Sequence, residues 1–582
     1  MNQIFSRVKF KKKYFVWLFT FLIIAIAGET ALPTLMAEMI EQGVVNQATN
    51  SIWLLAGGMV LVVLMAFVGN MLVAKISSRI ATLFARDVRK ALFDKVQSFS
   101  GQELDKFGTA SLITRTTSDV TNLQSFLSAG LQIGMLAPLM MAAGVVLVAV
   151  TGGETSSVLV FTLPILLIAM TVVLVLATRY SKALRLTLDK INRIFLEILQ
   201  GVRVIRAFNK QETEKARFGQ TNSQYADISL KNNRLMGGMM PFIQVIFGLT
   251  TIGVMAVGAE AVAKGKITVS ALVANSQYVA LILGAIVMAA FIISFFPTAF
   301  ASMSRIGEVL GIEVKITDGD DEQAMTEAQG TVTFKDVTFS YADAAEPVLK
   351  DISFTSKPGQ VTAIIGGATG SGKSSVLKLI PRLYDITFGE IKVNGRNVKD
   401  YKLQELRDII GYVPQKNVLF SGDIASNLNF GQEDGTEADW KRAADIASAS
   451  EFIADKPGNY QSEIAQGGTN LSGGQRQRMA IARAMMKRPQ VYLLDDSLSA
   501  LDMKTDKQVR TNLRANLDQA TMIMVAQRIS SIMDAEQIIL ISEGKIAGKG
   551  THKELLKNND IYRELAILQL GEEAVAYELD NA

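Results

Sequence analysis

The sequence predicts an α-helical polytopic membrane domain with six transmembrane helices, followed by a soluble α/β domain. Hydrophobic residues make up 49% of the 582 residues and gather in long, nearly uncharged segments of the first half. About 20 apolar residues suffice to cross a hydrocarbon core roughly 30 Å thick. From Thr331 onward, short β patterns alternate with amphipathic helices, which is typical of a soluble α/β domain.

Charge and cysteine content narrow the possible functions. The net charge of +4 is too small to indicate nucleic acid as a partner, and the Lys and Arg residues lie where membrane topology would place them. The chain has no cysteine, which excludes disulfides, thiolate metal sites and a cysteine nucleophile. The partner that composition indicates is the lipid bilayer.

The first membrane span follows a basic stretch and opens with Tyr14, Phe15 and Trp17, an interfacial aromatic cluster. A cleaved signal peptide is the alternative, but its apolar region is normally only about 7–15 residues long. The apolar stretch here is longer and no convincing cleavage site follows it, so we expect a retained helix. The predicted spans lie near 14–40, 52–74, 126–150, 158–178, 236–262 and 271–300.

Loop charge predicts the orientation of these spans. The long connections 75–125 and 179–235 are rich in Lys and Arg, whereas the short connections 41–51 and 151–157 contain neither. Because positive charge favours the cytoplasmic side, we expect both long loops, both termini and the α/β domain to be cytoplasmic. The long loops also have the pattern of amphipathic helices that continue the spans. The expected domains are a transmembrane domain over 1–310, an acidic linker over 311–330, and the α/β domain with a helical tail over 331–582.

A glycine-rich motif follows the buried-strand pattern Val361–Ile365 and precedes a helix that begins near Ser374. This strand-loop-helix context is what a phosphate-binding loop requires. Glycines let backbone N–H groups turn toward phosphates. We expect Lys373 to reach the β- and γ-phosphates and the Ser374 hydroxyl to bind Mg²⁺. An additional glycine, Gly366, lies between the strand and the motif. The motif itself consists of Gly367, Ala368, Thr369, Gly370, Ser371, Gly372, Lys373 and Ser374.

A second motif comprises Leu471, Ser472, Gly473, Gly474 and Gln475. Such a pattern arises by chance on the order of once in a thousand chains of this length. It lies just before a buried-strand pattern that ends in Asp495-Asp496. With these motifs, residues 331–570 resemble an ATP-binding-cassette (ABC) nucleotide-binding domain, an α/β P-loop ATPase. The whole chain resembles a half-transporter of the exporter type, which implies ATP and Mg²⁺ as cofactors.

The resemblance assigns roles to single residues. Tyr341 corresponds to the aromatic residue that stacks on adenine, and Gln415 to the glutamine that touches Mg²⁺ and signals to the membrane domain. Asp495 corresponds to the metal-associated carboxylate, and Asp502 to the D-loop that crosses to the partner ATPase. Ser375 completes the expected nucleotide contacts. Without the resemblance, Tyr341 would be an exposed turn aromatic and Gln415 a surface polar residue.

Two cytoplasmic segments, Phe107–Ser111 and Arg206–Lys210, resemble the coupling helices of the family. Ordinary surface helix is the alternative for both segments. The single histidine, His552, lies well past the position of the family's switch histidine. We expect His552 to be a surface residue at a helix start rather than a catalyst or ligand.

Two positions depart from the family pattern: Asp496 replaces the usual Glu, and Gln527 replaces the switch histidine. Aspartate lacks one methylene, so its carboxylate lies about 1.5 Å further back. A misplacement of about 1 Å can cost around a hundredfold in rate. Glutamine can donate a hydrogen bond to the γ-phosphate but carries neither a proton nor a positive charge for transfer. We therefore expect nucleotide binding with slow hydrolysis, both catalytic positions being degenerate.

ABC domains close head-to-tail, with ATP between one chain's phosphate loop and the other chain's signature. The motif Leu471–Gln475 corresponds to this family signature, and the chain keeps it while its own catalytic pair, Asp496 and Gln527, is altered. The resemblance is therefore closest to one half of a heterodimeric exporter in a bacterial cell membrane, whose non-identical partner supplies the Glu and the His. A homodimer would contain two weakened sites.

The sequence says least about the substrate. Glu29 lies inside the first predicted span, where a carboxylate is costly unless it faces water or protein. It is either a cation-attracting residue of a substrate cavity or a structural hydrogen-bonding residue. Six apolar residues allow two interpretations: they form an adaptable apolar wall of a substrate cavity, or they occupy lipid-facing or core positions. These residues are Met236, Met239, Met240, Phe291, Phe295 and Phe296.

The leading hypothesis is an ATP-driven exporter of hydrophobic or amphipathic drugs, cationic ones included. A lipid or peptide exporter and an importer of metal chelates with the same frame are alternatives. A nucleotide-gated regulatory subunit that does not pump is an alternative of a different class.

Overall fold

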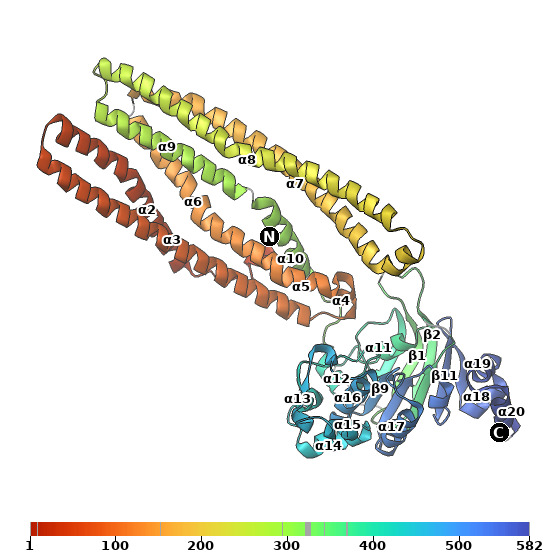
Figure 1. Ribbon diagram of the computed structural model, residues 1–582. Coiled ribbons are helices and arrows are strands. Elements are labelled where there is room, and N and C mark those ends of the chain that lie inside the picture. The colour runs from red at the N-terminus through yellow and green to blue at the C-terminus, as the bar shows by residue number, and fades with distance from the viewer. Residues whose placement is uncertain are drawn as a thin grey trace. The chain divides into compact units, whose positions relative to one another are not determined.

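The computed structural model describes residues 2–8, 10–151, 153–293, 295–319, 327–342, 344–367 and 370–580. The chain divides into two compact units, shown in Figure 1. The first unit comprises Met1–Gln97 and Thr109–Ile312, and the second comprises Ser98–Gly108 and Glu313–Ala582. A short segment from the first long loop thus belongs to the same unit as the α/β domain.

The first unit contains six helical segments long and apolar enough to cross a membrane, within the part of the chain that is described. This confirms the six predicted spans. Most segments far exceed the roughly 20 residues that a bilayer requires, so the amphipathic loops do continue the spans as helix. The segments are Lys12–Val45, Thr49–Gln97, Thr109–Thr151, Gly153–Ala207, Gln211–Ala263 and Val269–Gly311.

Neighbouring helices of this unit pack in antiparallel pairs, with α2 beside α3, α6 beside α9, and α7 beside α8 (Figure 1). The first pair approaches closely through small residues: a Cβ added to Gly28 would lie 2.8 Å from Cβ of Ala66. Small residues allow such close helix approach in membranes. The helices are α1 (Asn2–Phe5), α2 (Lys12–Glu38), α3 (Thr49–Gln97), α5 (Thr109–Thr114), α6 (Val120–Thr151), α7 (Ser156–Ala207), α8 (Gln211–Ala263), α9 (Val269–Ile293) and α10 (Phe296–Gly311).

The second unit is built on two main sheets. The larger has the order β12-β11-β3-β10-β9-β6, in which all neighbours are parallel except the edge pair β11–β12. The smaller is antiparallel, with the order β2-β1-β4-β5. The strands are β1 (Val332–Phe339), β2 (Leu349–Ser356), β3 (Val361–Ile365), β4 (Phe388–Val393), β5 (Arg396–Asn397), β6 (Ile410–Val413), β7 (Gly422–Asp423), β8 (Glu463–Ile464), β9 (Val491–Asp495), β10 (Thr521–Val525), β11 (Gln537–Ser542) and β12 (Lys545–Gly550).

Every residue of β3, β9 and β10 is buried, as continuous apolar runs in a parallel sheet predict. Ligands of such sheets bind at the carboxyl ends of the strands, where the segments after these three strands converge. The helices are α4 (Gly101–Phe107), α11 (Lys373–Leu379), α12 (Leu403–Asp408), α13 (Ile424–Asn429), α14 (Glu437–Ile446), α15 (Ser450–Ala454), α16 (Gly473–Met486), α17 (Met503–Ala515), α18 (His552–Asn558), α19 (Asp560–Leu570) and α20 (Glu572–Asp580).

The expected surface position of His552 is wrong. It does begin a helix, α18, but it is only 6% exposed. Its Nδ1 lies 2.7 Å from the Tyr562 hydroxyl, and its Nε2 lies 2.7 Å from Oε2 of Glu578. The imidazole is buried because α19 and α20 fold back over the start of α18, and both ring nitrogens have partners there.

Candidate functional site

The phosphate loop leaves β3 and enters α11 at Lys373. Gly370 and Gly372 have φ of 89° and 94°, a left-handed conformation that glycine adopts readily. Space is a second constraint at Gly372, because an added Cβ would lie 2.6 Å from Cδ2 of Leu349. Successive N–H groups in such a turn form a concave anion site. Ala368 and Thr369 of the motif lie outside the described residues.

The additional glycine, Gly366, is required by packing. A Cβ at this position would lie 2.6 Å from the backbone oxygen of Ile541 in β11 and 2.7 Å from Oγ of Ser371. The sheet and the loop therefore leave no room for a side chain between β3 and the motif.

A cavity of about 440 Å³ opens beside the phosphate loop and gathers most of the predicted nucleotide contacts. Two α19 residues, Leu565 and Gln569, also line it, although no sequence pattern singled them out. Those predicted residues that line the cavity are Tyr341, Gly367, Gly370, Ser371, Gly372, Lys373, Ser374, Ser375, Gln415, Asp496 and Gln527.

Lys373 folds back toward its own loop. Its Nζ donates to Oγ of Ser371 at 3.0 Å and to the backbone oxygen of Gly366 at 3.5 Å. Burial lowers the pKa of the Lys373 ammonium, while the carboxylates of Asp496 and Asp495 act in the opposite direction. A partly desolvated cation at the head of α11 is well placed to attract phosphate.

Ser374 and Asp495 form a pair of oxygen donors, with Oγ of Ser374 donating to Oδ1 of Asp495 at 2.6 Å. Burial raises the pKa of Asp495, despite the opposing hydrogen bond from Ser374. Tyr412 of β6, which no sequence pattern assigned to the site, also hydrogen-bonds to Asp495, and burial raises the pKa of the Tyr412 hydroxyl. Hydroxyl, carboxylate and amide oxygens suit Mg²⁺, which usually takes one or two protein carboxylates together with substrate phosphates. The residues present fit this ion.

Asp496 lies at the centre of an amide cluster. Its Oδ2 accepts from Nε2 of Gln527 at 2.7 Å and from Nε2 of Gln415 at 3.3 Å. The residue follows β9 with φ of 49°, and its backbone oxygen accepts from Oγ of Ser499 at 2.9 Å. Burial raises the pKa of Asp496, although the surrounding hydrogen bonds favour the charged form. The fold therefore brings Asp496 and Gln527, the two positions expected to be degenerate, into direct contact.

Tyr341 is half-buried at the cavity wall. Its hydroxyl lies 3.0 Å from Oγ of Ser375, and its ring meets Phe339 and Tyr384 edge-on at centroid distances of 4.8 and 5.2 Å. It is therefore a fixed wall residue and not a free turn aromatic; stacking on adenine stays a prediction.

The signature does not line this cavity. Ser472 caps α16, where its Oγ accepts from the Gln475 backbone N–H at 3.2 Å and the Gln475 side chain accepts from the Ser472 N–H. Asp502 caps α17 by accepting from the N–H groups of Lys504 and Thr505. Gln477, which no sequence pattern singled out, connects α16 to the segment before α17, because its Oε1 accepts from Ala500 N–H at 3.0 Å.

The first coupling candidate, Phe107–Ser111, comprises the end of α4 and the start of α5, and its coupling role stays a prediction. A Ser100–Glu103 capping box starts α4 at Gly101, and Gly108 with φ of 70° ends it. Asp105 of α4 accepts a hydrogen bond from the Tyr384 hydroxyl at 2.6 Å, and Gly101 N–H donates to the Leu383 backbone. The second candidate, Arg206–Lys210, joins α7 to α8 in the first unit, and its coupling role stays a prediction.

The first unit contains a largely apolar, open cavity of about 880 Å³ lined by residues of α2, α6, α8 and α9. Glu29 lies in its wall, where its Oε1 accepts from Nδ2 of Asn70 at 2.8 Å. Of the six residues proposed as an apolar wall, only Met240 lines this cavity; Phe295 lines a different one. The other methionines of the wall are Met140 and Met288.

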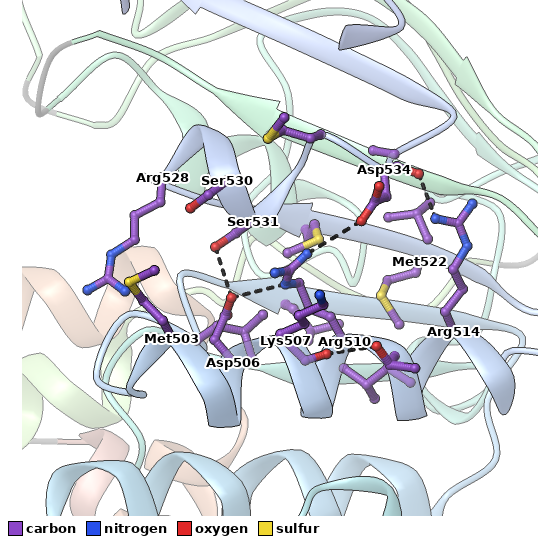
Figure 2. Close-up of a pocket in the computed structure, with 18 residues that line it drawn as sticks. Met503, Asp506, Lys507, Arg510, Arg514, Met522, Arg528, Ser530, Ser531 and Asp534 are labelled. Carbon is purple, nitrogen blue, oxygen red and sulfur yellow. Dashed lines mark hydrogen bonds and ion pairs between the residues drawn. The ribbon is translucent and has the colours of Figure 1, made fainter. Parts of the chain in front are cut away.

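A further cavity of about 390 Å³ lies beside α17 and is lined by none of the predicted site residues. Figure 2 shows Asp506 between Arg510 and Ser531, which donate to it at 3.0 and 3.3 Å. Arg514 donates to the backbone oxygen of Asp534 at 2.6 Å. Much of the charge in this cavity is thus compensated within its own walls.

Family models match both parts of the chain. The ABC transporter transmembrane region matches residues 15–286, and the ABC transporter model matches residues 349–499. An ABC transporter ATP-binding protein of Mycobacterium tuberculosis is 36% identical over 92% of this chain and 93% of its own length. YfiB, an ABC transporter ATP-binding protein of Bacillus subtilis, is 34% identical over 94% of this chain and 95% of its own length. The chain belongs to the ABC transporter family.

Within this class it is a half-transporter, in which one transmembrane region is joined to one ATP-binding domain. Its fold is that of a bacterial Atm1-family ABC exporter solved with ATP bound. The TM-score is 0.79 at 23% identity, covering 95% of this chain and 97% of the other. A Staphylococcus aureus protein named as a candidate multidrug export ATP-binding/permease protein is 29% identical over 83% of both chains.

Proposed function

We propose that this chain is one half of a heterodimeric ABC exporter in a bacterial cell membrane, and that its own nucleotide site binds ATP but hydrolyses it slowly. The observation that carries the proposal is the Gln527–Asp496 contact. A neutral amide holds the carboxylate that stands where the family has a glutamate. The shorter Asp496 carboxylate lies further from the attacking water than a glutamate would, and the Gln527 amide cannot transfer a proton as a histidine can.

Binding itself is supported by the groups around the cavity. Backbone N–H groups of the glycine turns, the Lys373 ammonium and the N-terminus of α11 favour the phosphates. Ser374, Asp495 and Gln415 are the residues that would hold Mg²⁺, which neutralises phosphate charge when it is bound. Tyr341 is placed to cover the adenine. The backbone N–H groups, Lys373, Ser374 and Asp495 remain in place whichever residue occupies position 496 or 527, so binding and hydrolysis are separable.

The intact signature motif supports the proposal of a partner chain. Ser472 and the start of α16 lie outside this chain's phosphate cavity, so they are free to serve the γ-phosphate of an ATP bound to another chain. A non-identical half-transporter with Glu and His at the two altered positions would form a competent site with this signature. Asp502 would lie at the same junction.

The substrate class is supported by the cavity with Glu29 in its wall. Methionines and Phe247 provide a polarizable apolar surface, while one carboxylate favours a positive charge. Hydrophobic or amphipathic drugs, cationic ones included, fit this lining, and the name of the Staphylococcus aureus relative agrees with it. In the resulting cycle, ATP closes the two ATPases, the helices rearrange to open the cavity outward, and hydrolysis resets them. Both termini and the ATPase are cytoplasmic in this scheme.

The test is to reconstitute the full chain in lipid nanodiscs alone and together with a half-transporter that carries Glu and His at the two altered positions. We expect ATP binding in both samples, slow hydrolysis by the chain alone, and fast substrate-stimulated hydrolysis by the pair. Full transporter rates from the chain alone would disprove the weak-site proposal. ATP-dependent uptake of a cationic dye into inside-out vesicles containing the pair supports export, and uptake only into right-side-out vesicles would reverse the direction.

A further inference from the structure

Helix α19 reaches two loops of the nucleotide cavity at once. Leu565 lies against the phosphate loop, since a Cβ added to Gly367 would meet its Cδ2 at 3.6 Å. Gln569 follows four residues later, and positions i and i+4 share one face of a helix. Both side chains line the same cavity. One face of α19 therefore contacts both the phosphate loop and the segment after β10. We call this second segment, residues 526–530, the switch segment.

Gln569 holds the switch segment through both ends of its amide. Its Nε2 donates to the backbone oxygen of Gln527 at 3.0 Å, and its Oε1 accepts from the backbone N–H of Ile529 at 2.8 Å. The two bonds bracket the peptide units that follow Gln527. The Gln527 side chain in turn donates to Asp496 at 2.7 Å. Loss of the Gln569 amide would free the backbone that aims this side chain.

The position of α19 is fixed by buried residues adjacent to Leu565 and Gln569 on the same face of the helix. Tyr562 and Ala566 are fully buried against the domain core. The Tyr562 hydroxyl contacts the buried imidazole of His552, which also contacts Glu578 of α20. The single histidine thus connects α18, α19 and α20. The exposed Gln569 side chain extends from a helix that is itself well anchored.

We propose that Gln569 is a positioning residue for ATP hydrolysis. Helix α19 contacts both the phosphate loop and the switch segment and thereby fixes the position of one relative to the other. The C-terminal helices then belong to the hydrolytic apparatus. The inference rests on the nucleotide site proposed above, and on neither the substrate nor the identity of the partner. A residue that merely stabilises the domain would affect binding and turnover together, whereas this role predicts an effect on turnover alone.

The local arm of the test measures hydrogen exchange of the switch segment in the full-length chain in nanodiscs, without nucleotide. Gln569→Ala removes both hydrogen bonds, while Gln569→Glu keeps an acceptor for the Ile529 N–H and loses the donor to Gln527. Glu564→Ala, on an exposed position of the same helix, is the matched control. We expect at least about fivefold faster exchange of the Ile529 amide in Gln569→Ala, the factor that corresponds to one ordinary hydrogen bond. Exchange in Gln569→Glu and in the control should stay near wild type.

The functional arm measures single-turnover conversion of ATP with protein in excess, which quantifies even a slow site, together with the dissociation constant of ATP. We expect turnover to fall about five- to tenfold in both Gln569 variants, and the dissociation constant to stay within about twofold. Unchanged exchange, unchanged turnover, or affinity that falls in parallel with turnover would each overturn the proposal. If the wild-type chain binds no ATP, the nucleotide site itself is wrong, and this inference falls with it. Fast wild-type turnover would contradict only the weak-site proposal and leaves the comparison of variants intact.

Discussion

The side-chain amide of Gln527 donates to Oδ2 of Asp496 across 2.7 Å, so the two positions that depart from the family pattern touch each other. Both residues line the cavity beside Lys373. A change at one position therefore alters the environment of the other, and the two must be tested together.

Restoring both positions should accelerate hydrolysis at this site. Asp496→Glu lengthens the carboxylate by one methylene, and Gln527→His supplies a titratable ring. We expect the double variant to raise single-turnover hydrolysis about ten- to hundredfold in the presence of a partner with an intact signature, and each single variant to raise it much less. If Asp496→Glu alone gave the whole gain, the neutral amide at position 527 would be no obstacle to hydrolysis.

The Asp105–Tyr384 contact should be needed for the transported substrate to stimulate ATP hydrolysis. Asp105→Ala removes the acceptor of a 2.6 Å hydrogen bond. We expect basal ATP hydrolysis by the assembled pair to be unchanged and substrate stimulation to fall about three- to tenfold. Lys106→Ala, on the same helix, is the control and should retain stimulation. Equal stimulation in wild type and Asp105→Ala would assign α4 a purely structural role.

The stability of the N-terminal turn of α4 should depend on pH through the ionisation of Glu103. Burial raises the pKa of this carboxyl, but hydrogen bonds from the Ser100 hydroxyl and from backbone N–H groups of Ser100 and Lys315 outweigh it, so the pKa is lowered. A lowered pKa means that the stabilisation is present above the ordinary carboxyl pKa of about 4.3 and is lost as pH falls through the still lower folded value.

A spin label at Lys106→Cys measures this effect cleanly, because the chain has no other cysteine. We expect the label to stay immobile from pH 7 down to the ordinary carboxyl range and to become mobile below it. With Glu103→Gln in the same background, mobility should no longer change with pH in that range. Mobility that rises between pH 6 and 7 would point to a different group.

Glu29 should discriminate between cationic and neutral substrates. Glu29→Gln keeps the size and a hydrogen-bonding oxygen for Asn70 but removes the charge. We expect transport of a cationic dye by the pair to fall about tenfold, which corresponds to roughly 1.4 kcal/mol of lost attraction, and transport of a neutral analogue to change less than twofold. Asn70→Ala serves as the control for loss of the hydrogen bond. A parallel loss for both dyes in Glu29→Gln would make this residue structural.

Local sequence patterns were sufficient to predict those features that depend only on residues close together in the chain. The apolar runs determined the six spans, because membrane insertion depends on the length and polarity of a segment. The glycine motif determined the loop between β3 and α11, because positive φ at Gly370 and Gly372 is a property of single residues. The capping role of Ser472 also has a short-range signature, with Gln475 three residues later.

Contacts between distant segments were not predictable from such patterns. His552 begins a helix as expected, yet nothing near it in the chain indicates that Glu578 and Tyr562 will cover it. Tyr412 and Gln569 carry no periodic signal, and they join the site only because β6 and α19 fold against it. Asp105 of α4 contacts Tyr384, which lies 279 residues later in the chain, so no local pattern indicated this contact.

The sequence by itself therefore determined the class of protein, the order of its two parts and the chemical identity of most groups that line the cavity beside the phosphate loop. Only the tertiary structure decided that Asp496, Gln527 and Gln569 form one connected chain of hydrogen bonds, and that Glu29 borders a cavity. Residue type and spacing fix what a side chain can do, whereas its partners depend on the packing of strands and helices far apart in the sequence.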